Sequence, residues 1–290
     1  MTGIKFRQRT CRNMYGNYET IQDNQISLYV VLTHKCNAHC KFCEFTHGDV
    51  EVDIKEFAIT LDKLLGICYI SMVHFTGGEP TTEIEKLKEL LNIVKTKDRL
   101  ITTSVNTNGY NLSLLDGLKE LDNISLSRHA IPDEDNYNIF GCKNIPSTTD
   151  IQCFKDKHKL HISCNLIKGY IDSNEKIMDY MEFASKLGVN DIGLVSLMQI
   201  NEYCKEHYVE FDEGLAKESD RITKSNCFCN DESGSVTCKC ENYLYRAQNC
   251  SLISAYHRYA IKSNQISDYL VYENNILKQG FNGEPIGLGR

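Results

Sequence analysis

The chain has 290 residues, a formal net charge of −7 and 41% hydrophobic residues. This length suits one large domain or a domain with an extension, and the hydrophobic share supports a sizeable core. The negative charge disfavours generic attraction to nucleic acid or anionic lipid. With 14 cysteines, no secretory h-region and no apolar run of membrane-spanning length, we expect a cytoplasmic, reduced protein without a disulfide framework.

The first residues of the chain are basic, although the chain as a whole is negatively charged. Lys5, Arg7, Arg9 and Arg12 all precede the first acidic residue, Glu19. We interpret residues 1–22 as a basic N-terminal arm. It is expected to be a solvated, mobile end, and contact with phosphates is the alternative.

Apolar, strand-like runs alternate with segments of helical spacing from residue 26 to residue 197. This rhythm indicates parallel βα units wound in the right-handed sense. Six units are too few for a closed eight-stranded barrel, so residues 23–200 are predicted to form an α/β fold, a partial (β/α)6 TIM-like barrel. The predicted strands cover 26–32, 70–75, 100–107, 123–127, 160–166 and 192–197. The predicted helices cover 53–65, 82–95, 112–121 and 173–187, and 127–147 is predicted to be a loop.

Three cysteines, Cys36, Cys40 and Cys43, follow the first barrel strand with the spacing C-x3-C-x2-C. A zinc ion would need a fourth protein ligand, usually from two C-x2-C pairs. Three close thiolates without a local fourth suit an iron–sulfur cluster with one iron left open to a small molecule. Buried or stray thiols are the alternative interpretation.

A second motif, Gly77-Gly78-Glu79, follows the second predicted strand. Adjacent glycines let the backbone approach a ligand closely, and Glu79 offers a carboxylate at the end of the strand. The alternative is an ordinary glycine turn leading into a helix, where Glu and Pro80 are both favourable. The two motifs in this order are hard to obtain by chance.

Together the two motifs resemble the signature of the radical S-adenosylmethionine (SAM) enzymes. The resemblance implies that Cys36, Cys40 and Cys43 ligate a [4Fe–4S] cluster whose open iron binds SAM. An electron from the cluster then cleaves SAM to methionine and a 5′-deoxyadenosyl radical. It also implies that Gly77, Gly78 and Glu79 hold the SAM amino group. Less specific matches to the family imply that Phe42 and Met198 lie at the adenine of SAM. They also imply that Ser127 and Asn165 contact the ribose or carboxylate. The turn that starts at Asn106 is expected near SAM or substrate.

Alternate residues of three predicted strands are polar on one side only. We expect helices to cover the apolar side and the polar side to line a lumen that holds a polar ligand at the carboxyl ends of the strands. The polar residues are Thr102, Ser104, Asn106, Asn108, Asn123, Ser125, Ser127, His129, His161, Ser163 and Asn165.

Two residues of the segment 127–147 are candidate catalytic groups. His129 could donate a proton or bind substrate, and a histidine satisfied by its neighbours is the alternative. Cys142 follows Gly141 and could return a hydrogen atom to a substrate radical, as a thiol does in some members of the family that the chain resembles. A plain packed or surface thiol is the alternative.

Beyond residue 200 the alternation of helices and strands stops, and residues 201–290 are predicted to form a small, mostly β module on the barrel mouth. Within it, four cysteines form C-x-C-x8-C-x-C on a predicted hairpin. On paired strands they could share one patch, which suits zinc, a second cluster or a face of reduced thiols. These residues are Cys227, Cys229, Cys238 and Cys240.

We therefore expect a radical SAM enzyme that abstracts a hydrogen atom from a small polar substrate, such as a sugar, nucleoside or amino-acid derivative. Modification of a ribosomal peptide is the alternative. A non-catalytic iron–sulfur or zinc protein is a third possibility, but it would need no motif for the SAM amino group. The expected partners are the substrate and an electron donor such as flavodoxin or ferredoxin, with no membrane and no generic nucleic-acid binding.

Overall fold

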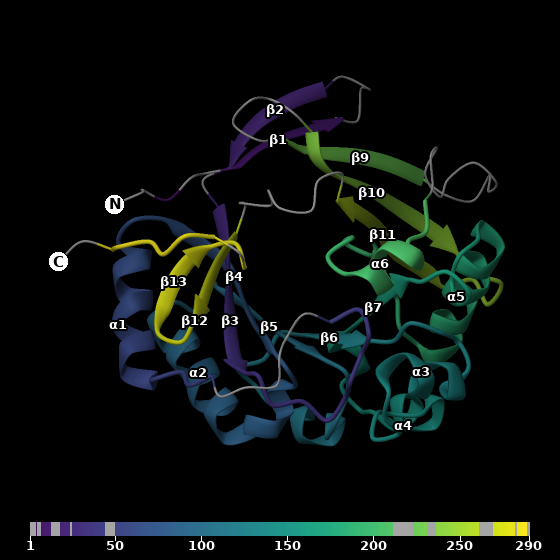
Figure 1. Cartoon of the computed structure of the whole chain (residues 1–290), viewed down its shortest axis with the longest axis horizontal. Helices are drawn as coiled ribbons and strands as arrows, with labels where there is room; N and C mark the ends of the chain where they lie inside the picture. Colours follow the sequence, from purple (N-terminus) through teal and green to yellow (C-terminus); the bar gives the residue numbers. More distant parts are fainter. Residues whose placement is uncertain are drawn as a thin grey trace.

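Six parallel strands follow one another in sequence order at the centre of the molecule (Figure 1). The computed structural model describes residues 4, 7–12, 18–23, 25–43, 50–210, 223–230, 236–260, 269–281 and 283–288. Within these ranges the strands form one 13-stranded sheet in the order β13-β12-β3-β4-β5-β6-β7-β8-β11-β10-β9-β1-β2. The central strands β3 to β8 form the partial barrel that the sequence predicts.

The barrel strands and their main helices occupy nearly the predicted ranges. The strands are β3 (Gln25–Thr33), β4 (Tyr69–Gly77), β5 (Thr102–Thr107), β6 (Asn123–Ser127), β7 (Leu160–Leu166) and β8 (Asp191–Ser196). The helices are α1 (Ile54–Leu65), α2 (Ile84–Lys97) and α5 (Asn174–Leu187), and a 3-10 turn, η1 (Pro80–Glu83), precedes α2.

Local signals in the sequence set the ends of these helices. The Asp53 carboxylate accepts hydrogen bonds from the first free N–H groups of α1, and Ser173 does the same for α5. Helix α5 ends at Gly188, which has a φ of 77°, a left-handed conformation that glycine adopts without a steric penalty.

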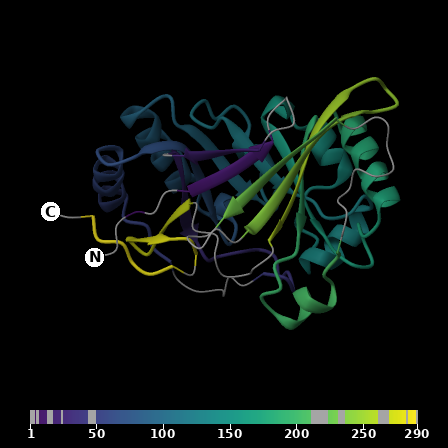
Figure 2. The ribbon, with the colours of Figure 1, turned by 90° about the horizontal axis from the view of Figure 1, so that it is seen from above.

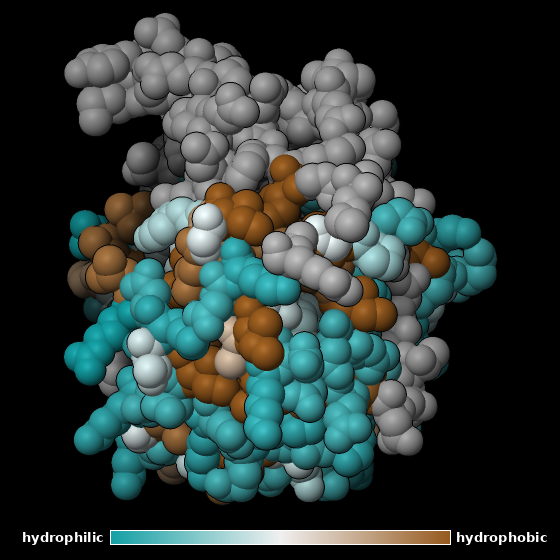
Figure 3. Space-filling view, turned by 90° about the vertical axis from the view of Figure 1, so that its left-hand side faces the viewer, coloured by the Kyte–Doolittle hydropathy of each residue, from teal (hydrophilic) through white to brown (hydrophobic). Residues whose placement is uncertain are grey.

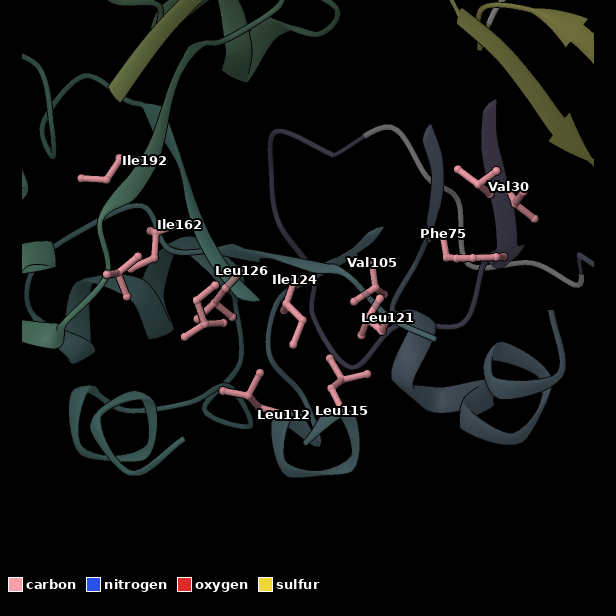
Figure 4. Packing of buried hydrophobic residues seen from close by; sticks show 14 of the residues in the cluster. Val30, Phe75, Val105, Leu112, Leu115, Leu121, Ile124, Leu126, Ile162 and Ile192 are labelled. Atoms are coloured by element: carbon pink, nitrogen blue, oxygen red, sulfur yellow. The ribbon is translucent and has the colours of Figure 1, made fainter. Parts of the chain in front are cut away.

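The hydrophobic core lies between the outer face of the sheet and the helices. Strands β6 and β7 alternate between half-buried and fully buried side chains. In Figure 4 the side chains of Val105, Ile124 and Leu126 point toward the layer that holds Leu112 and Leu115. Helices therefore shield the apolar side of the sheet, and the opposite, inner side carries the half-buried polar residues.

The predicted helix 112–121 is wrong. Only Leu112–Leu115 is helical, as a 3-10 turn (η2), and Gly117 then takes a φ of 75°. Leu112, Leu115 and Leu121 are all buried. A glycine in the left-handed conformation ends the helical turn, so the rest of this connection is irregular. The three buried leucines anchor it to the core.

The predicted loop 127–147 is also wrong, because it contains helix α3 (Asp133–Phe140). Three acidic residues occupy the first turn of α3, where they interact favourably with the helix dipole, and Gly141 ends it with a φ of 63°. A second short helix, α4 (Thr148–Cys153), begins at a capping box formed by Ser147 and Asp150. A 3-10 turn, η3 (Lys157–Lys159), leads into β7.

Segments from both ends of the chain extend the barrel sheet (Figure 2). Strand β11 (Leu252–Ala260) runs parallel to β8, and β12 (Tyr269–Glu273) runs parallel to β3, so both edges of the six-stranded barrel are paired. The remaining elements are α6 (Glu202–Glu206), β1 (Arg7–Arg12), β2 (Tyr18–Asp23), β9 (Thr223–Asn230), β10 (Val236–Arg246) and β13 (Ile276–Gln279).

These pairings alter two expectations about the ends of the chain. Residues 7–12 and 18–23 are strands of the sheet, with β1 paired to β9, so the expectation of a solvated, mobile N-terminal end is wrong for these residues. The predicted C-terminal hairpin is present as β9 and β10. However, the strands beyond residue 200 continue the barrel sheet at its two edges. The division of the chain at residues 22 and 200 stays an expectation.

Figure 3 shows the side of the molecule that carries α1. Hydrophilic side chains cover much of its lower part, and patches of hydrophobic side chains reach the surface between them. In the described part of the chain, none of the helices has the length and apolar character needed to cross a membrane.

Candidate active site

The three motif cysteines lie on the loop that follows β3. Cys36 and Cys40 are half-buried, and Cys43 is exposed. The N–H of Cys43 donates to the carbonyl oxygen of Cys40 over 3.1 Å, which turns the chain so that the last two cysteines lie on one bend. Ala38, Phe140 and Ile145 form a small hydrophobic cluster against which Cys36 and Cys40 pack.

Burial raises the pKa of both half-buried thiols. For Cys40, burial is the largest cause, and the neighbouring thiols of Cys43 and Cys36 add to it. For Cys36, burial again dominates, a hydrogen bond from the Ala38 N–H opposes it, and Glu79 and Cys43 raise the pKa further. Without a metal these groups are therefore neutral thiols, and binding iron would release their protons.

The donor set fits a cluster better than a single ion. Among the described residues, no group of three or more His, Cys, Asp or Glu side chains is arranged to hold one metal ion. The thiols of Cys36, Cys40 and Cys43 nevertheless lie within electrostatic range of one another. A [4Fe–4S] cluster takes each cysteine thiolate on a different iron, so three thiols that share one neighbourhood suit three of its four irons.

The two predicted glycines bring the loop after β4 against the start of the cysteine loop. The N–H of Gly78 donates to the Thr33 carbonyl at 2.7 Å, and the N–H of Glu79 donates to the Lys35 carbonyl at 2.8 Å. A Cβ on Gly77 would lie 2.2 Å from the Thr33 oxygen, and one on Gly78 would lie 2.3 Å from the Lys35 oxygen. In this structure the close approach that requires glycine is made to the protein's own backbone.

The Glu79 carboxylate is fully buried and lies in a network of donors. Its Oε1 accepts from the Thr81 N–H at 3.0 Å, the Thr81 hydroxyl at 2.7 Å and the Thr107 hydroxyl at 2.7 Å. Among the residues that the structure describes, the donor to its Oε2 is the Asn108 N–H, at 2.8 Å. Burial raises the pKa of Glu79, and these donors oppose that rise. Of the two oxygens, Oε2 retains capacity for a further donor.

The end of β5 joins this network to the cysteine loop. The Asn108 side-chain amide donates to Oδ1 of Asn37 at 2.8 Å and lies 3.8 Å from the Cys36 sulfur. Asn106, two residues earlier, is half-buried on the inner face of the sheet. The end of β5, the Glu79 carboxylate and the first motif cysteine are therefore joined through consecutive hydrogen bonds.

Inner-face residues of β6 and β7 line the same side of the sheet as Asn106. Ser125, Ser127, Ser163 and Asn165 are all half-buried, while the residues between them are fully buried toward the helices. This agrees with the one-sided polar pattern in the sequence. Sites in parallel-strand barrels form at the carboxyl ends of the strands, and Ser127 and Asn165 lie at those ends.

His129 lies in an aromatic cluster directly after β6. Its ring stacks on Phe140 with centroids 4.9 Å apart and meets Phe42 edge-on at 5.2 Å. Its Nδ1 accepts the Asn165 N–H at 3.0 Å. Burial, with a smaller effect of Arg128, lowers the pKa of His129 to about 3. Because the imidazole of His129 is neutral and packed between aromatic rings, a role as proton donor is disfavoured. Its contacts instead hold Phe42 and Asn165 in place.

Cys142 lies beside the cysteine loop. The Asn37 side-chain amide approaches its sulfur to 3.7 Å, and the Phe140 carbonyl accepts the His39 N–H at 2.8 Å. Burial raises the pKa of Cys142, so it is a neutral thiol, the form that can give up a hydrogen atom. Met198, by contrast, is 44% exposed on the segment after β8.

Sequence reasoning missed several residues that hold the site together. Asn37 and Thr81 are not among the residues that the sequence predicts for the site, and Asn108 is predicted only as a polar residue of the inner face and of the turn after it. Asn37 lies inside the cysteine motif, and Thr81 follows Pro80 directly, so their positions were the only available signal. The second cysteine group is described only by the backbone pairing of β9 and β10.

A protein-family model described as "Radical SAM superfamily" matches residues 30–211. The matching curated proteins include a probable GTP 3′,8-cyclase from Saccharolobus islandicus (strain L.S.2.15 / Lassen #1), 32% identical over 178 residues. This match covers 59% of the present chain and 56% of the relative. A protein of the same name from Metallosphaera sedula is 29% identical over 177 residues, covering 59% and 55%. The chain thus matches little more than half the length of these relatives.

Solved structures of Streptococcus suis SuiB share the fold. The SAM-bound form is 19% identical, with a TM-score of 0.52 over 65% of the present chain and 44% of SuiB. The form bound to the precursor peptide SuiA is 18% identical, with a TM-score of 0.50 over 66% and 44%. At this identity, the likeness supports the architecture of the barrel.

Proposed function

The chain belongs to the radical SAM superfamily, and from this premise we propose that it abstracts a hydrogen atom from a small polar substrate of the nucleoside or nucleotide class. The family implies a [4Fe–4S] cluster and SAM as cofactors. When bound, these cofactors supply reductive cleavage of SAM and the 5′-deoxyadenosyl radical that begins the reaction. The protein orients the cofactors and excludes competing reactions.

In this proposal Cys36, Cys40 and Cys43 hold the cluster, and the loop after β4 binds SAM. Oε2 of Glu79 retains a lone pair that can accept from one more donor, which suits the SAM amino group. Phe42 supplies an aromatic ring within the cysteine loop, in line with a role beside adenine. Met198 is expected to meet adenine through its backbone.

The residues around these groups have positioning tasks. Asn108 supports Asn37 and Cys36, and Thr107 supports the Glu79 carboxylate. His129 fixes the N–H of Asn165, whose side chain belongs to the polar inner face. These contacts hold the cofactor loops in a fixed arrangement, which an enzyme needs in order to aim a reactive radical at one bond.

The observation that carries the substrate class is the polar inner face formed by β5, β6 and β7. Its hydroxyl and amide groups, from Asn106, Ser125, Ser127, Ser163 and Asn165, suit a ligand with many hydrogen-bonding groups. The curated relatives that match over the barrel bear the name GTP 3′,8-cyclase, which makes guanosine nucleotides the first substrates to test. Because the match covers about half of those relatives, their whole reaction does not transfer to this chain.

The experiment is an anaerobic reaction of the reconstituted protein with SAM and dithionite. We expect 5′-deoxyadenosine to form, and to form faster with a guanosine nucleotide or nucleoside than without one. With substrate deuterated on the ribose, deuterium should appear in 5′-deoxyadenosine. The variant with Cys36, Cys40 and Cys43 replaced by Ala is the negative control.

Two results would overturn the proposal at different levels. Formation of 5′-deoxyadenosine with no response to nucleotides, nucleosides, sugars or amino-acid derivatives, but a response to peptides, would favour the peptide alternative. A reconstituted protein with a full cluster and no SAM cleavage in any mixture would contradict the proposed catalytic function itself.

A further inference from the structure

Both ends of the cysteine loop meet one turn from the part of the chain beyond residue 200. The loop runs from the end of β3 to the start of α1, and residues 34–43 and 50–53 of it are described. The turn consists of Glu273, the last residue of β12, with Asn274 and Asn275, and we call it the hairpin turn. Because β12 runs parallel to β3, the hairpin turn lies at the same end of the sheet as the cysteine loop (Figure 1).

The shape of the hairpin turn follows from its two asparagines. Asn274 and Asn275 have φ angles of 50° and 60°, and Glu273 pairs with Ile276 across β12 and β13. A two-residue hairpin with both central φ angles positive has the pattern of a type I′ turn, for which asparagine is a favoured residue. The turn therefore has a defined backbone conformation that directs its side chains.

Glu273 holds the start of the loop. Its Oε1 lies 2.8 Å from Nε2 of His34, two residues before Cys36, and its Oε2 accepts from Lys278 at 2.6 Å. Burial raises the pKa of Glu273, but the hydrogen bonds from Lys278 and His34 outweigh that effect and hold the pKa below its usual value. Glu273 is therefore an ionised carboxylate, which can only accept, so Nε2 of His34 is the donor.

The two asparagines hold the end of the loop. Oδ1 of Asn274 accepts the N–H of Glu51 at 3.3 Å, and Oδ1 of Asn275 accepts the N–H of Asp53 at 2.8 Å. Asp53 is also the N-cap residue of α1. Asn275 therefore joins the hairpin turn to the point where the loop passes into the helix.

The hairpin that carries this turn is anchored in the core. The side chain of Tyr272 is fully buried and meets Phe57 of α1 with ring centroids 5.4 Å apart. Its hydroxyl donates to Oδ1 of Asn275 at 3.1 Å. Leu277 of β13 is also buried. Close packing of these side chains makes the hairpin turn a fixed point to which the loop is attached.

A loop that brings three thiols to one cluster loses conformational freedom on binding, and a loop whose ends are already fixed loses less. We propose that the hairpin turn positions the cysteine loop for the cluster, with Glu273 holding its start through His34 and the two asparagines holding its end. In this role Glu273, Asn274 and Asn275 are positioning residues. The proposal rests on the proposed function, in which the three motif cysteines bind the cluster.

The test is the double variant Asn274→Gly/Asn275→Gly, which removes the two acceptors and keeps the turn. Glycine adopts a positive φ without a steric penalty, and Gly-Gly is itself a favoured type I′ sequence. The first readout is hydrogen–deuterium exchange of the metal-free protein, measured by mass spectrometry. We expect faster exchange at residues 36–43 than in the wild type, because the loop has lost two contacts at its other end.

The second readout is the rate at which a chelator removes iron after anaerobic reconstitution. The double variant should lose iron at least about two-fold faster, since a net hydrogen bond is worth roughly two- to ten-fold in an equilibrium constant. Unchanged exchange at residues 36–43 or an unchanged rate of iron loss would overturn the proposal. A wild-type chain that takes up no cluster would contradict the proposed function itself, and the exchange measurement would still decide whether the hairpin turn orders the loop.

Two control variants separate this role from the stability of turns and of the hairpin. Asn111→Gly changes another exposed asparagine with a positive φ, 54°, whose side chain makes no capping hydrogen bond. Tyr272→Phe removes the hydroxyl that bonds to Asn275 and keeps the contacts of both asparagines with the loop. Both controls should match the wild type in exchange at residues 36–43 and in iron loss. If Tyr272→Phe reproduces the double variant, the effect belongs to hairpin stability and the proposal is wrong.

Glu273→Ala tests the start of the loop. It removes the acceptor of His34, so exchange at residues 36–43 and iron loss should again be faster than in the wild type. Lys278→Ala is the matched control, because it removes the other partner of the carboxylate and leaves the contact with His34 in place. Equal effects of the two replacements would assign Glu273 to its ion pair within the hairpin and contradict its positioning role.

Discussion

The N–H of Gly78 donates to the carbonyl oxygen of Thr33 over 2.7 Å and joins the ends of neighbouring strands β4 and β3. Thr33 begins the cysteine loop, and Gly78 lies in the motif proposed to bind SAM. The two cofactor-binding loops are therefore one hydrogen-bonded unit. A change that separates these backbones should disturb the cluster and the SAM site together.

Gly77→Ala tests this coupling. Its new Cβ would lie 2.2 Å from the Thr33 oxygen, and Gly77 has a φ of 129°, which L side chains rarely adopt. We expect less cluster per chain and weaker SAM binding, measured by iron content and by SAM titration. Gly66→Ala is the control, because its Cβ would lie 3.5 Å from the nearest backbone oxygen at an ordinary φ. Normal iron content and SAM affinity in Gly77→Ala would contradict the coupling.

Glu79→Gln separates the charge of Glu79 from its shape. The amide of the glutamine would face the Asn108 N–H or the Thr81 and Thr107 donors, so a buried hydrogen bond is lost at a cost of roughly 1–3 kcal/mol. We expect lower stability in urea unfolding and an increase of about ten-fold or more in the SAM dissociation constant. Glu83→Gln, which removes a surface pair with Lys35, is the control. An unchanged SAM affinity would leave Glu79 with a purely structural role.

Replacing Cys36, Cys40 and Cys43 with Ala should remove the proposed catalytic cluster and all SAM cleavage. The physical reason is that no other described thiol lies on this loop to take their place. The measurement is 5′-deoxyadenosine formation after anaerobic reconstitution. Cys68→Ala, at a half-buried thiol between α1 and β4, is the control. Continued SAM cleavage by the triple variant would refute the assignment of the cluster.

Cys142→Ala tests hydrogen return to the substrate radical. Cys142 is a neutral thiol near Cys36 and Cys40, so it has a suitable protonation state and place. If it returns the hydrogen atom, the variant should still consume substrate and form 5′-deoxyadenosine but give a different product. Product analysis by mass spectrometry distinguishes the cases. The wild-type product at the wild-type rate would assign Cys142 to packing.

The buried His129 predicts a loss of stability in mild acid. Burial lowers its pKa to about 3, below its ordinary value of 6.5, so only the unfolded chain takes up a proton between these pH values. Stability from this group is full above pH 6.5 and falls by about 2 kcal/mol from pH 7 to pH 5. His129→Gln should reduce the difference between urea unfolding at these two pH values. His39→Gln, at an exposed site, should not, and equal differences for the wild type and His129→Gln would contradict the prediction.

Local patterns in the sequence were sufficient for the barrel and for the central motifs. The six barrel strands, helices α1, α2 and α5 and the caps at Asp53, Ser173 and Gly188 follow from short-range periodicity and capping chemistry. Cysteine spacing and Gly77-Gly78-Glu79 indicated the family, because both motifs are contiguous in the chain. The failures at 112–121 and 127–147 also have local causes. Gly117 ends the short helical turn at 112–115. In the segment 127–147, three acidic residues start helix α3 and Gly141 ends it.

Contacts between distant segments depended on the tertiary structure. The sequence gives no sign that Glu79 is surrounded by donors from Thr81, Thr107 and Asn108, because the strands that bring them together are paired through space. The sequence likewise does not show that Cys11 of β1 lies opposite Cys227 of β9. Strand register between segments more than 200 residues apart is set by the packing of the whole sheet. The sequence by itself therefore determined the barrel and its family, and the tertiary structure decided which side chains share a site.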